Sequence, residues 1–392
     1  MPLYMTLAFL TVVSGLGFGL SAYGWSRLQT LAYRGWPYEG TQALLAPLDE
    51  GWFWGVSTVL TTSYFVIGKL VPTRPLRWLG WLSGLWMGYL ALCLFLLGPL
   101  HLAEQVVGLF WTPGEWLGNV TARLTLVGFH LAFVFALASV LAPPKLGEVE
   151  VVSPRIGPEL DGLRIVQLSD VHIGPTIGPR FIEHLHRRVA ALDPDLIVMT
   201  GDLVDGEPRF LTEDVTRFLA LKQYATHGLV FITGNHEYIS GASAWVDLIR
   251  AQGVTVLENE HLTLTKGDDA FHLIGVEDWD GRRFDRTRGP HLKRAMAGIE
   301  DSPLFKLLLA HQPKAAPEAR DAGIDLQLSG HTHGGQIFPM NLLVQLDQPY
   351  VGGQYALGNM TLYVNPGTGY WGPPLRLGTR SEITLVTLRR PA

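Results

Sequence analysis

The first 144 residues consist of long apolar stretches joined by short polar loops. Four of these stretches reach the roughly 18–20 residues that a helix needs to cross a bilayer. They are residues 5–23, 52–71, 78–102 and 122–142. Tryptophans gather near their ends, as side chains at a membrane interface do. The pattern therefore predicts an α-helical transmembrane region of about four helices.

The pattern changes after Pro143 and Pro144, which cannot continue a helix. From there on, short apolar runs rich in β-forming residues alternate with amphipathic segments. The expected strands are residues 163–168, 195–200, 229–233, 271–276, 305–310, 325–329, 360–364 and 382–388. The expected helices are residues 179–192, 214–222 and 241–252. Strands that alternate with helices predict a layered α/β domain.

Composition supports this division. Of the 30 Lys and Arg and the 35 Asp and Glu, only eleven precede Lys145, whereas nine of the twelve tryptophans do. The two parts are therefore expected to lie in different solvents. A net charge of −5 gives no electrostatic case for nucleic-acid binding. The single cysteine, Cys93, excludes a disulfide framework and a thiolate metal site.

The distribution of basic residues predicts an orientation in the membrane. Lys69, Arg74 and Arg77 lie between the second and third expected spans, and Lys145 and Arg155 follow the fourth. Because basic loops stay in the cytoplasm, both termini are expected there. We therefore expect an integral protein of the inner (cytoplasmic) membrane whose large polar domain faces the cytoplasm.

Polar side chains follow five of the expected strands at the point where each strand ends. They are Asp170 and His172, then Asp202, then Asn235 and His236, then His311, and finally His331 and His333. In an open α/β sheet the carboxyl ends of the strands share one edge, and ligands bind there. These side chains are therefore expected to converge.

Imidazole, carboxylate and amide groups in this number suit two divalent cations better than a single catalytic triad. Two such cations typically lie about 3.5–4 Å apart and share a ligand. A carboxylate can bridge them because it has two oxygens, so one Asp is expected between them. Each residue taken alone would more often be an ordinary loop residue, and the prediction depends on the five strand ends together.

The segments SDVHIG, TGDLVD, GNHEY, LAHQP and SGHTHGGQI, in this order, resemble the calcineurin-like metallophosphoesterases. The resemblance covers roughly residues 160–390. The segment GGQIFP and the tail from Tyr363 onward resemble a bacterial, membrane-associated branch that acts on lipid intermediates of the UDP-2,3-diacylglucosamine type. Asn365 and Pro366 stand where that branch has a Ser-Arg pair, on its substrate side.

The resemblance implies a fold of two β-sheets packed as a sandwich and flanked by helices. Together with the apolar region, it divides the chain into a transmembrane helical domain, a linker and a calcineurin-like metallophosphoesterase domain. Their expected limits are residues 1–144, 145–160 and 161–392.

The resemblance also implies a role for each polar residue. One metal ion would be held by Asp170, His172 and His333, and the other by Asn235, His311 and His331, with Asp202 as the bridge. His236 would be catalytic and would act on the leaving-group oxygen, and Asp205 would orient it. Glu237 is expected to support the loop that carries them.

These observations predict a membrane-anchored dimetal phosphoesterase that hydrolyses a phosphodiester or pyrophosphate bond by attack of a metal-bridging hydroxide. The expected partners are the lipid bilayer and a lipid-linked phosphate substrate. Manganese is the expected metal, and iron, zinc or cobalt suits the same ligands. One alternative is an anchored phosphodiesterase or phosphatase for soluble substrates, and another is a membrane sensor or transporter with a regulatory domain. The oligomeric state stays open.

Overall fold

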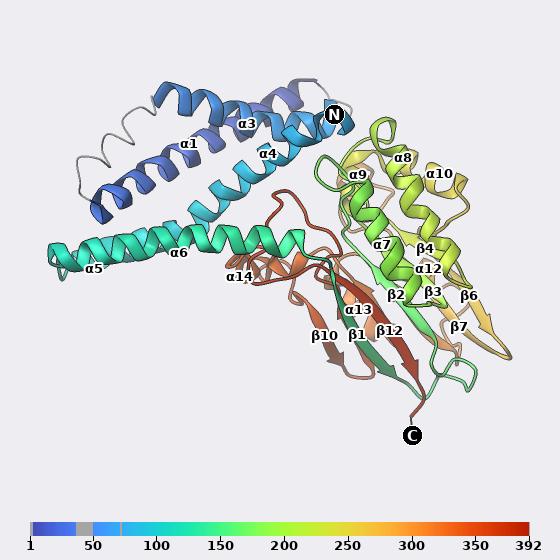
Figure 1. The fold of residues 1–392 in the computed structure, drawn as a ribbon. Helices are drawn as coiled ribbons and strands as arrows, with labels where there is room; N and C mark the ends of the chain where they lie inside the picture. Colours follow the sequence, from blue (N-terminus) through green and yellow to red (C-terminus); the bar gives the residue numbers. More distant parts are fainter. Residues whose placement is uncertain (1–2, 37–49, 71–72, 392) are drawn as a thin grey trace. The chain divides into compact units, whose positions relative to one another are not determined.

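The computed structural model describes residues 3–36, 50–70 and 73–391 (Figure 1). These residues form two compact units. One is helical and contains the chain up to Leu141 together with the segment Gly372–Leu377. The other begins at Ala142, runs to Trp371 and resumes at Gly378. Each unit has its own interior.

The helical unit is built from long apolar helices. They are α1 (Leu3–Gly35), α3 (Glu50–Leu70), α4 (Thr73–Leu92), α5 (Gly98–Gly108) and α6 (Glu115–Leu141). A π-helical turn, Cys93–Leu97, joins α4 to α5. Pro99 follows directly in the first turn of α5, where its missing N–H is tolerated.

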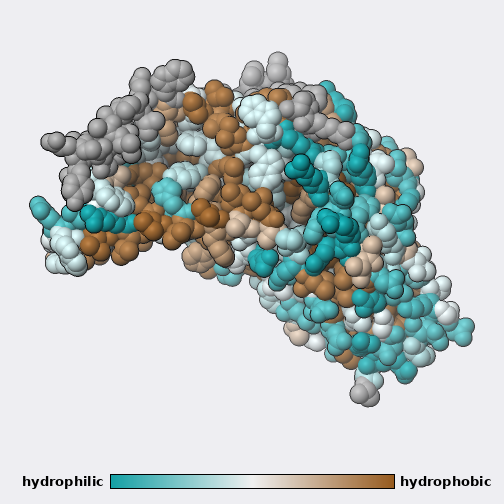
Figure 2. Space-filling view, viewed as in Figure 1, coloured by the Kyte–Doolittle hydropathy of each residue, from teal (hydrophilic) through white to brown (hydrophobic). Residues whose placement is uncertain are grey.

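Two helical stretches among the described residues are long and apolar enough to cross a membrane, Leu76–Gly108 and Glu115–Leu141. The first contains the span expected at residues 78–102, and the second contains all but the last residue of the span expected at residues 122–142. Large apolar side chains such as Leu102 and Leu124 are exposed on them, and a hydrophobic surface runs along α5 and α6 (Figure 2). This surface suits lipid rather than water. The spans expected earlier in the chain fall in α1 and α3, and the count of four stays a prediction.

The second unit contains two six-stranded mixed sheets. The first has the order β1-β12-β2-β3-β4-β5, and the second has the order β10-β11-β9-β8-β7-β6. In the first sheet, strands β2 to β5 are parallel. In the second, β7, β8, β9 and β11 are parallel. The α/β domain with two sheets, expected from the sequence, is therefore present.

The strands are short, and helices connect the parallel ones (Figure 1). The strands of the first sheet are β1 (Lys145–Val152), β2 (Arg164–Leu168), β3 (Leu196–Thr200), β4 (Leu229–Ile232), β5 (Thr255–Val256) and β12 (Glu382–Arg389). Those of the second are β6 (Glu260–Lys266), β7 (Asp269–Gly275), β8 (Phe305–Leu309), β9 (Leu326–Ser329), β10 (Gly353–Leu357) and β11 (Met360–Val364). The main helices are α7 (Pro179–Ala191), α8 (Pro208–Leu219), α9 (Asn235–Ser240), α10 (Ala242–Ala251) and α13 (Ala316–Asp321).

The linker expected at residues 145–160 is corrected by the structure. Its first half is strand β1, which pairs in parallel with β12 over its whole length. Val149 and Val151 point into the interior while their neighbours do not. Such an alternation of buried and exposed residues indicates a strand with one face in the core. Its partner, β12, comes from the far end of the chain, so the local sequence does not show the pairing. The sequence also did not predict β5, β6 and β10, which have few inward-facing residues.

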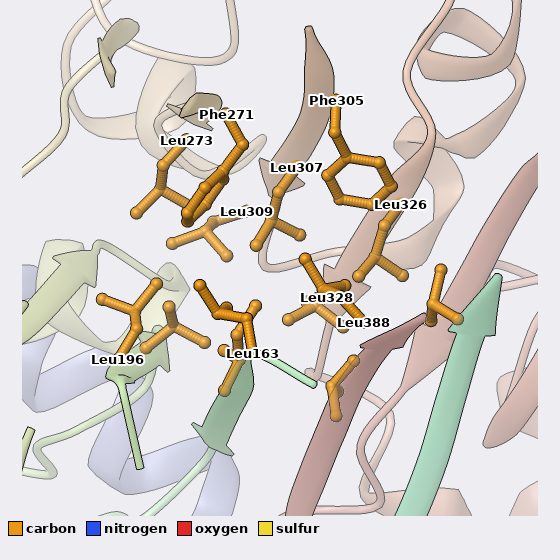
Figure 3. Packing of buried hydrophobic residues seen from close by; sticks show 14 of the residues in the cluster. Leu163, Leu196, Phe271, Leu273, Phe305, Leu307, Leu309, Leu326, Leu328 and Leu388 are labelled. Atoms are coloured by element: carbon orange, nitrogen blue, oxygen red, sulfur yellow. The ribbon is translucent and has the colours of Figure 1, made fainter. Parts of the chain in front are cut away.

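The core lies between the two sheets. Leu163, Leu196, Leu273, Leu307 and Leu328 meet there from strands far apart in the chain (Figure 3). Fully burying one such side chain stabilises the fold by about 1.5–3 kcal/mol. A second apolar cluster covers the other face of the second sheet, where Leu308 and Leu362 contact residues of α13 such as Ala319. The core therefore fixes the position of the two sheets relative to each other, below the carboxyl ends of their parallel strands.

Candidate metal centre

The expected site residues lie at the carboxyl ends of strands from both sheets. Strands β2, β3 and β4 of the first sheet deliver Asp170, Asp202 and Asn235, and strands β8 and β9 of the second deliver His311, His331 and His333. Gln167 of β2 joins the two sets, because its Nε2 donates to the carbonyl oxygen of Ser329 at 2.9 Å. The groups therefore converge between two sheets, whereas the strand-end argument had placed them on a single sheet edge.

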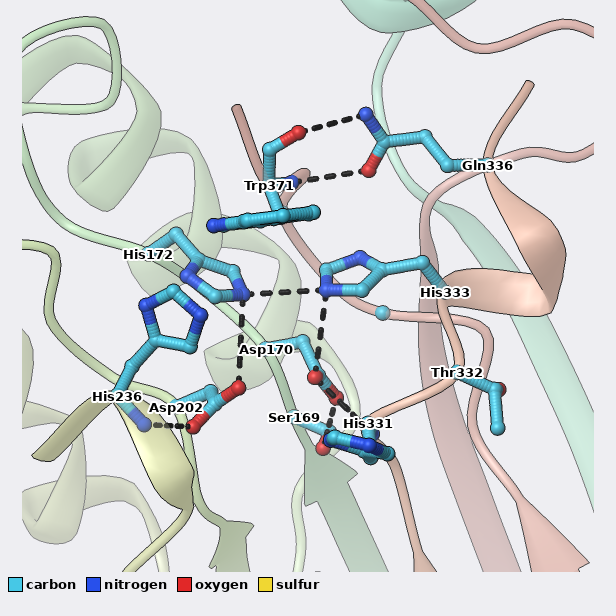
Figure 4. Close-up of polar contacts among 12 residues, drawn as sticks. Ser169, Asp170, His172, Asp202, His236, His331, Thr332, His333, Gln336 and Trp371 are labelled. Carbon is cyan, nitrogen blue, oxygen red and sulfur yellow. Dashed lines mark hydrogen bonds and ion pairs between the residues drawn. The ribbon is translucent and has the colours of Figure 1, made fainter. Parts of the chain in front are cut away.

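One cluster contains Asp170, His172 and His333, whose ligand atoms all lie within 4.8 Å of one another (Figure 4). The Nε2 atoms of His172 and His333 are 3.1 Å apart, and His333 Nε2 is 3.4 Å from Asp170 Oδ1. The carboxylate of Asp170 accepts the backbone N–H of His331 at 3.0 Å and the hydroxyl of Ser169. These donors fix the carboxylate beside the two imidazoles.

A second cluster contains Asp202, His311 and His331. Asn235 completes it, because its Oδ1 lies 3.0 Å from His331 Nδ1 and 3.2 Å from His311 Nε2. Asp202 Oδ2 is 3.2 Å from His311 Nε2 and 3.9 Å from His172 Nε2 of the first cluster. Asp202 therefore faces both clusters, as a bridging ligand must.

The hydrogen bonds of the second cluster test whether a cation fits. His311 Nδ1 lies 2.7 Å from the carbonyl oxygen of Thr200, which can only accept, so Nδ1 carries the proton. Burial would lower the pKa of His311, but the carboxylate of Asp202 raises it well above its usual range. A bound cation would replace the Nε2 proton, so that Nε2 would present a lone pair beside the oxygens of Asp202 and Asn235, which are also acceptors. Burial lowers the pKa of the adjacent His331 to about 3 and keeps that ring neutral. Lone pairs that converge on one another in this way are the donor set of a metal ion.

His236 and Asp205 lie beside the first cluster. Asp205 Oδ1 is 2.6 Å from His236 Nδ1 and 2.9 Å from His172 Nδ1. The sequence assigned Asp205 to His236 alone, whereas in the structure one carboxylate oxygen orients both imidazoles. The rings of His172 and His236 meet edge to face, with centroids 4.7 Å apart. Asp205 therefore fixes which nitrogen each ring turns towards the site.

Five of the candidate ligands adopt a left-handed backbone conformation. They are Asp170, His172, Asp202, His331 and His333, with φ between 52° and 70°. Such a conformation costs a non-glycine residue about 1–3 kcal/mol and persists where the surroundings impose it. The left-handed conformation at these strand ends therefore lowers the stability of the fold, and it directs the side chain of each candidate ligand into the site.

Two glycines next to the ligands have no room for a side chain. A Cβ on Gly234 would lie 2.2 Å from Asp202 Oδ1, and one on Gly330 would lie 2.2 Å from Asp170 Oδ2. Both residues follow a strand: Gly234 lets a carboxylate from the neighbouring strand approach the backbone, and Gly330 does so for a carboxylate from the other sheet. Close approach rather than a sharp turn explains these two glycines.

Burial and neighbouring charges shift the acid–base behaviour of the site. Burial alone would raise the pKa of Asp202, but the imidazoles of His311 and His236 hold it well below its usual range. Burial would lower the pKa of His236, but the carboxylates of Asp202 and Asp205 raise it to about 9. His236 is thus favoured as an imidazolium that can donate a proton. Bound dications oppose this shift, because nearby positive charge disfavours protonation.

Glu237 is fully buried and supports the site through the backbone. Its carboxylate accepts the N–H groups of Asp202 at 2.9 Å, Leu203 at 2.7 Å and Gly234 at 2.7 Å. Burial raises its pKa to about 7. Three backbone donors on one carboxylate fix the turns after β3 and β4 relative to each other, in keeping with the supporting role expected for Glu237.

Gln336 is a residue that the sequence reading missed. Its Nε2 donates to the carbonyl oxygen of Trp371 at 2.7 Å, and its Oε1 accepts the N–H of Trp371 at 2.9 Å. The indole of Trp371 is 53% exposed and lies 5.7 Å from the ring of His236 (Figure 4). Only its position directly after the segment GHTHGG marks Gln336 in the sequence.

Asn365, which departs from the resembled branch, is fully buried. Its side chain donates to Thr384 Oγ1 at 2.8 Å and accepts the N–H of Gly367 at 2.7 Å. Its polar atoms are therefore used within the fold.

The two-sheet fold and its convergent imidazole and carboxylate groups define a metal-dependent hydrolase. The family model described as calcineurin-like phosphoesterase matches residues 163–335. A protein of Danio rerio named "Transmembrane protein with metallophosphoesterase domain" is 34% identical over 343 residues, which cover 84% of this chain and 77% of that protein. The protein of the same name from Bos taurus is 40% identical over 268 residues, covering 65% and 60% of the two chains.

A bacterial relative, an uncharacterised metallophosphoesterase of Campylobacter jejuni, is 36% identical over 271 residues, which cover 68% of this chain and 69% of the relative. The chain belongs to the calcineurin-like metallophosphoesterase family and is a phosphoric ester hydrolase.

Proposed function

We propose that the chain is a membrane-anchored dimetal phosphoesterase that hydrolyses a phosphodiester or pyrophosphate bond in a lipid-linked substrate. The main support for this chemistry is that potential metal-ligand atoms from five strand ends lie close together. The Nδ1 atoms of His172 and His311 are hydrogen-bonded to Asp205 and to the carbonyl oxygen of Thr200, which leaves each Nε2 turned towards the site. This arrangement supports a pair of cations at the carboxyl ends of the strands.

The residues divide between two cation positions. Asp170, His172 and His333 would hold one cation, and Asn235, His311 and His331 would hold the other, with Asp202 contributing to both. When bound, divalent cations neutralise charge on a phosphoryl group and lower the pKa of water. Either Mn²⁺ or another divalent metal that takes imidazole and carboxylate suits this donor set.

The chain's own proton donor would be His236. Asp205 accepts from its Nδ1, which leaves Nε2 as the ring nitrogen available to the leaving-group oxygen. The backbone N–H of His236 donates to Asp202 Oδ1 at 2.8 Å, so the loop that carries the donor is tied to the proposed bridging ligand. A positioned proton donor contributes about 10²–10⁴ in rate.

The membrane part of the proposal is supported by the two long apolar helices and by the relatives named as transmembrane proteins. A site attached to a bilayer meets amphiphilic substrates at high local concentration. A lipid-linked pyrophosphate such as UDP-2,3-diacylglucosamine is therefore the proposed substrate type. Basic residues near the apolar segments favour a catalytic unit on the cytoplasmic side.

The test uses the full chain purified in detergent and supplied with Mn²⁺. Hydrolysis of UDP-2,3-diacylglucosamine and of bis(p-nitrophenyl) phosphate is measured in parallel, and bound metal is counted by mass spectrometry. The proposal expects two metal ions per chain and faster turnover of the lipid substrate. Asp202→Asn, which keeps the side-chain shape, should lose both metal and turnover. Turnover of the soluble ester alone would refute the lipid substrate, and a metal-free active enzyme would refute the dimetal site.

A further inference from the structure

The helical unit contains a second polar site. A cavity of about 690 Å³ lies between α1, α5 and the start of α6. The charged and strongly polar part of its lining comes from α1 and α5: Arg27, Thr30, Arg34, His101, Glu104 and Gln105. Charged side chains inside an apolar helical unit are costly and are kept where they bind or conduct something.

Arg27 is buried in this lining. Only 7% of the residue is exposed, and its Nη2 donates to Glu104 of α5. Its Nε has no hydrogen-bond partner among the residues that the structure describes. A buried guanidinium donor without an acceptor carries a desolvation penalty. An anionic group in the cavity would offset part of this penalty, because its charge would stabilise the buried guanidinium.

Arg34 extends the same face of α1, because it lies seven residues after Arg27 and thus about two helical turns further on. Its guanidinium lies against Gly118 of α6, where an added Cβ would come within 2.6 Å of Nη2. Gly118 therefore makes room for the second cation. The two arginines face a single acidic group, Glu104, so the charged groups of the cavity sum to one positive charge.

Another side of the cavity is mainly apolar. Leu100, Val107, Trp111 and Leu117 line this side, and Thr121 and Thr125 of α6 add hydroxyl groups to the lining. His101 lies between the two sides, with Nε2 3.1 Å from Gln105 Nε2 and its ring stacked on Tyr23. The volume lies within the range of small-molecule sites, about 300–1,000 Å³. It suits a head group and the first part of an acyl chain.

We propose that this cavity binds the phosphate head group of an anionic amphiphile, with Arg27 and Arg34 on the phosphate and the apolar side on the chain. A neutral apolar ligand would leave the net positive charge of the lining uncompensated, and a zwitterionic head group would bring a cation against the two arginines. The site consists only of residues of the helical unit and does not depend on the proposed phosphoesterase chemistry.

The test measures lipid retention by the full chain in detergent with native mass spectrometry. The probes are phosphatidic acid and phosphatidylcholine with identical acyl chains. Phosphatidic acid should be retained preferentially. Arg27→Gln should weaken its binding about tenfold, as expected for one charge-assisted hydrogen bond. Arg77→Gln, which removes a charge from α4 outside the cavity lining, should leave binding unchanged.

The ion pair provides a stricter criterion. Glu104→Gln should strengthen phosphatidic acid binding, because the carboxylate no longer competes with the phosphate for Arg27. A purely structural ion pair would make both variants weaken binding, and that result would overturn the proposal. Thermal melting shows whether Arg27→Gln folds. If it does not, the effect of Glu104→Gln on phosphatidic acid binding decides by itself whether the proposal holds.

A third arm distinguishes a lipid head group from free phosphate. Inorganic phosphate at the same concentration as the lipid should not displace phosphatidic acid, because it leaves the apolar side uncovered. Displacement at equal concentration, or equal retention of phosphatidylcholine, would overturn the assignment to an anionic amphiphile.

Discussion

At the scale of single residues, Asp205 couples the proposed catalytic and metal-binding functions, whereas His236 allows them to be tested separately. Asp205 Oδ1 contacts both His236 and His172, so it joins a proposed proton donor to a proposed metal ligand. A change at Asp205 would disturb both functions at once. His236 is the more informative position, because its Nδ1 is held by Asp205 and its loss need not remove a metal ligand.

His236→Ala is expected to keep its bound metal and lose about 10²–10⁴ in kcat, the usual contribution of a positioned proton donor. Metal content by mass spectrometry and turnover of a phosphodiester check the two halves of this statement. Asp205→Asn serves as the comparison, since it should lower metal occupancy as well. Full activity in His236→Ala would show that another group protonates the leaving oxygen.

At the scale of elements, the turn that begins at Gln336 fixes the loop that carries Trp371. The side-chain amide of Gln336 binds both backbone polar groups of Trp371, and its own carbonyl accepts Thr379 Oγ1 at 3.1 Å. Trp371 is largely exposed next to His236 and is placed to contact a substrate rather than the core.

Gln336→Ala is expected to raise KM several-fold with little change in kcat, because it releases the loop while leaving the metal ligands in place. Trp371→Ala should have the same effect, and the double variant should be no worse than either single one if the two act together. Steady-state kinetics on one substrate provide the measurement. A fall in kcat at constant KM would instead indicate that the loop supports the metal ligands.

Strand β7 carries a buried histidine that makes stability depend on pH. His272 Nδ1 lies 2.9 Å from Thr263 Oγ1, and Nε2 lies 2.8 Å from Ser302 Oγ. Burial lowers the pKa of His272, and His261 and Lys306 lower it further. The unfolded chain therefore binds a proton more readily than the folded one below about pH 6.5.

His272 should therefore destabilise the fold as the pH falls from about 6.5 through its lowered pKa. His272→Gln is expected to be less stable than the wild type at pH 8, by about 1 kcal/mol for one lost hydrogen bond. The difference should shrink at acidic pH. Denaturant unfolding at both pH values measures it, and a constant difference would show that His272 does not titrate in this range.

At the scale of the whole molecule, a large apolar surface on α5 and α6 distinguishes this chain from a water-soluble hydrolase. Leu102, Leu124 and Leu131 are exposed on helices long enough to span a bilayer. The second unit, by contrast, has two buried apolar clusters, one between its two sheets and one on the outer face of the second sheet.

The expressed protein should remain in the membrane pellet after alkaline carbonate washing and should be released by detergent. Burial of exposed leucines and valines in lipid, at roughly 25 cal/mol per Å², is the reason. Fractionation followed by immunoblotting checks this outcome. Release by carbonate alone would show that the helices lie on the membrane surface rather than across it.

The sequence by itself determined the class of domain and the identity of the candidate ligands. Strand-forming runs that end in Asp, Asn or His are local features, and their order along the chain carries the family resemblance. The two sheets followed from that resemblance, whereas strand-end reasoning alone gave one edge. The proposed ligand roles stay predictions, although the structure brings all seven residues together.

Only the tertiary structure decided which distant groups meet. In the structure, β1 pairs with β12, and Asp202 lies between the two clusters. Asp205 has two imidazole partners, and the side chain of Gln336 binds the backbone of Trp371. It also joined Arg27 to Glu104, 77 residues apart. The preference of a segment for helix, strand or turn depends on neighbouring residues, whereas contacts between distant segments depend on how the sheets and helices pack. The sequence therefore specified the chemical groups, and the packing specified their partners.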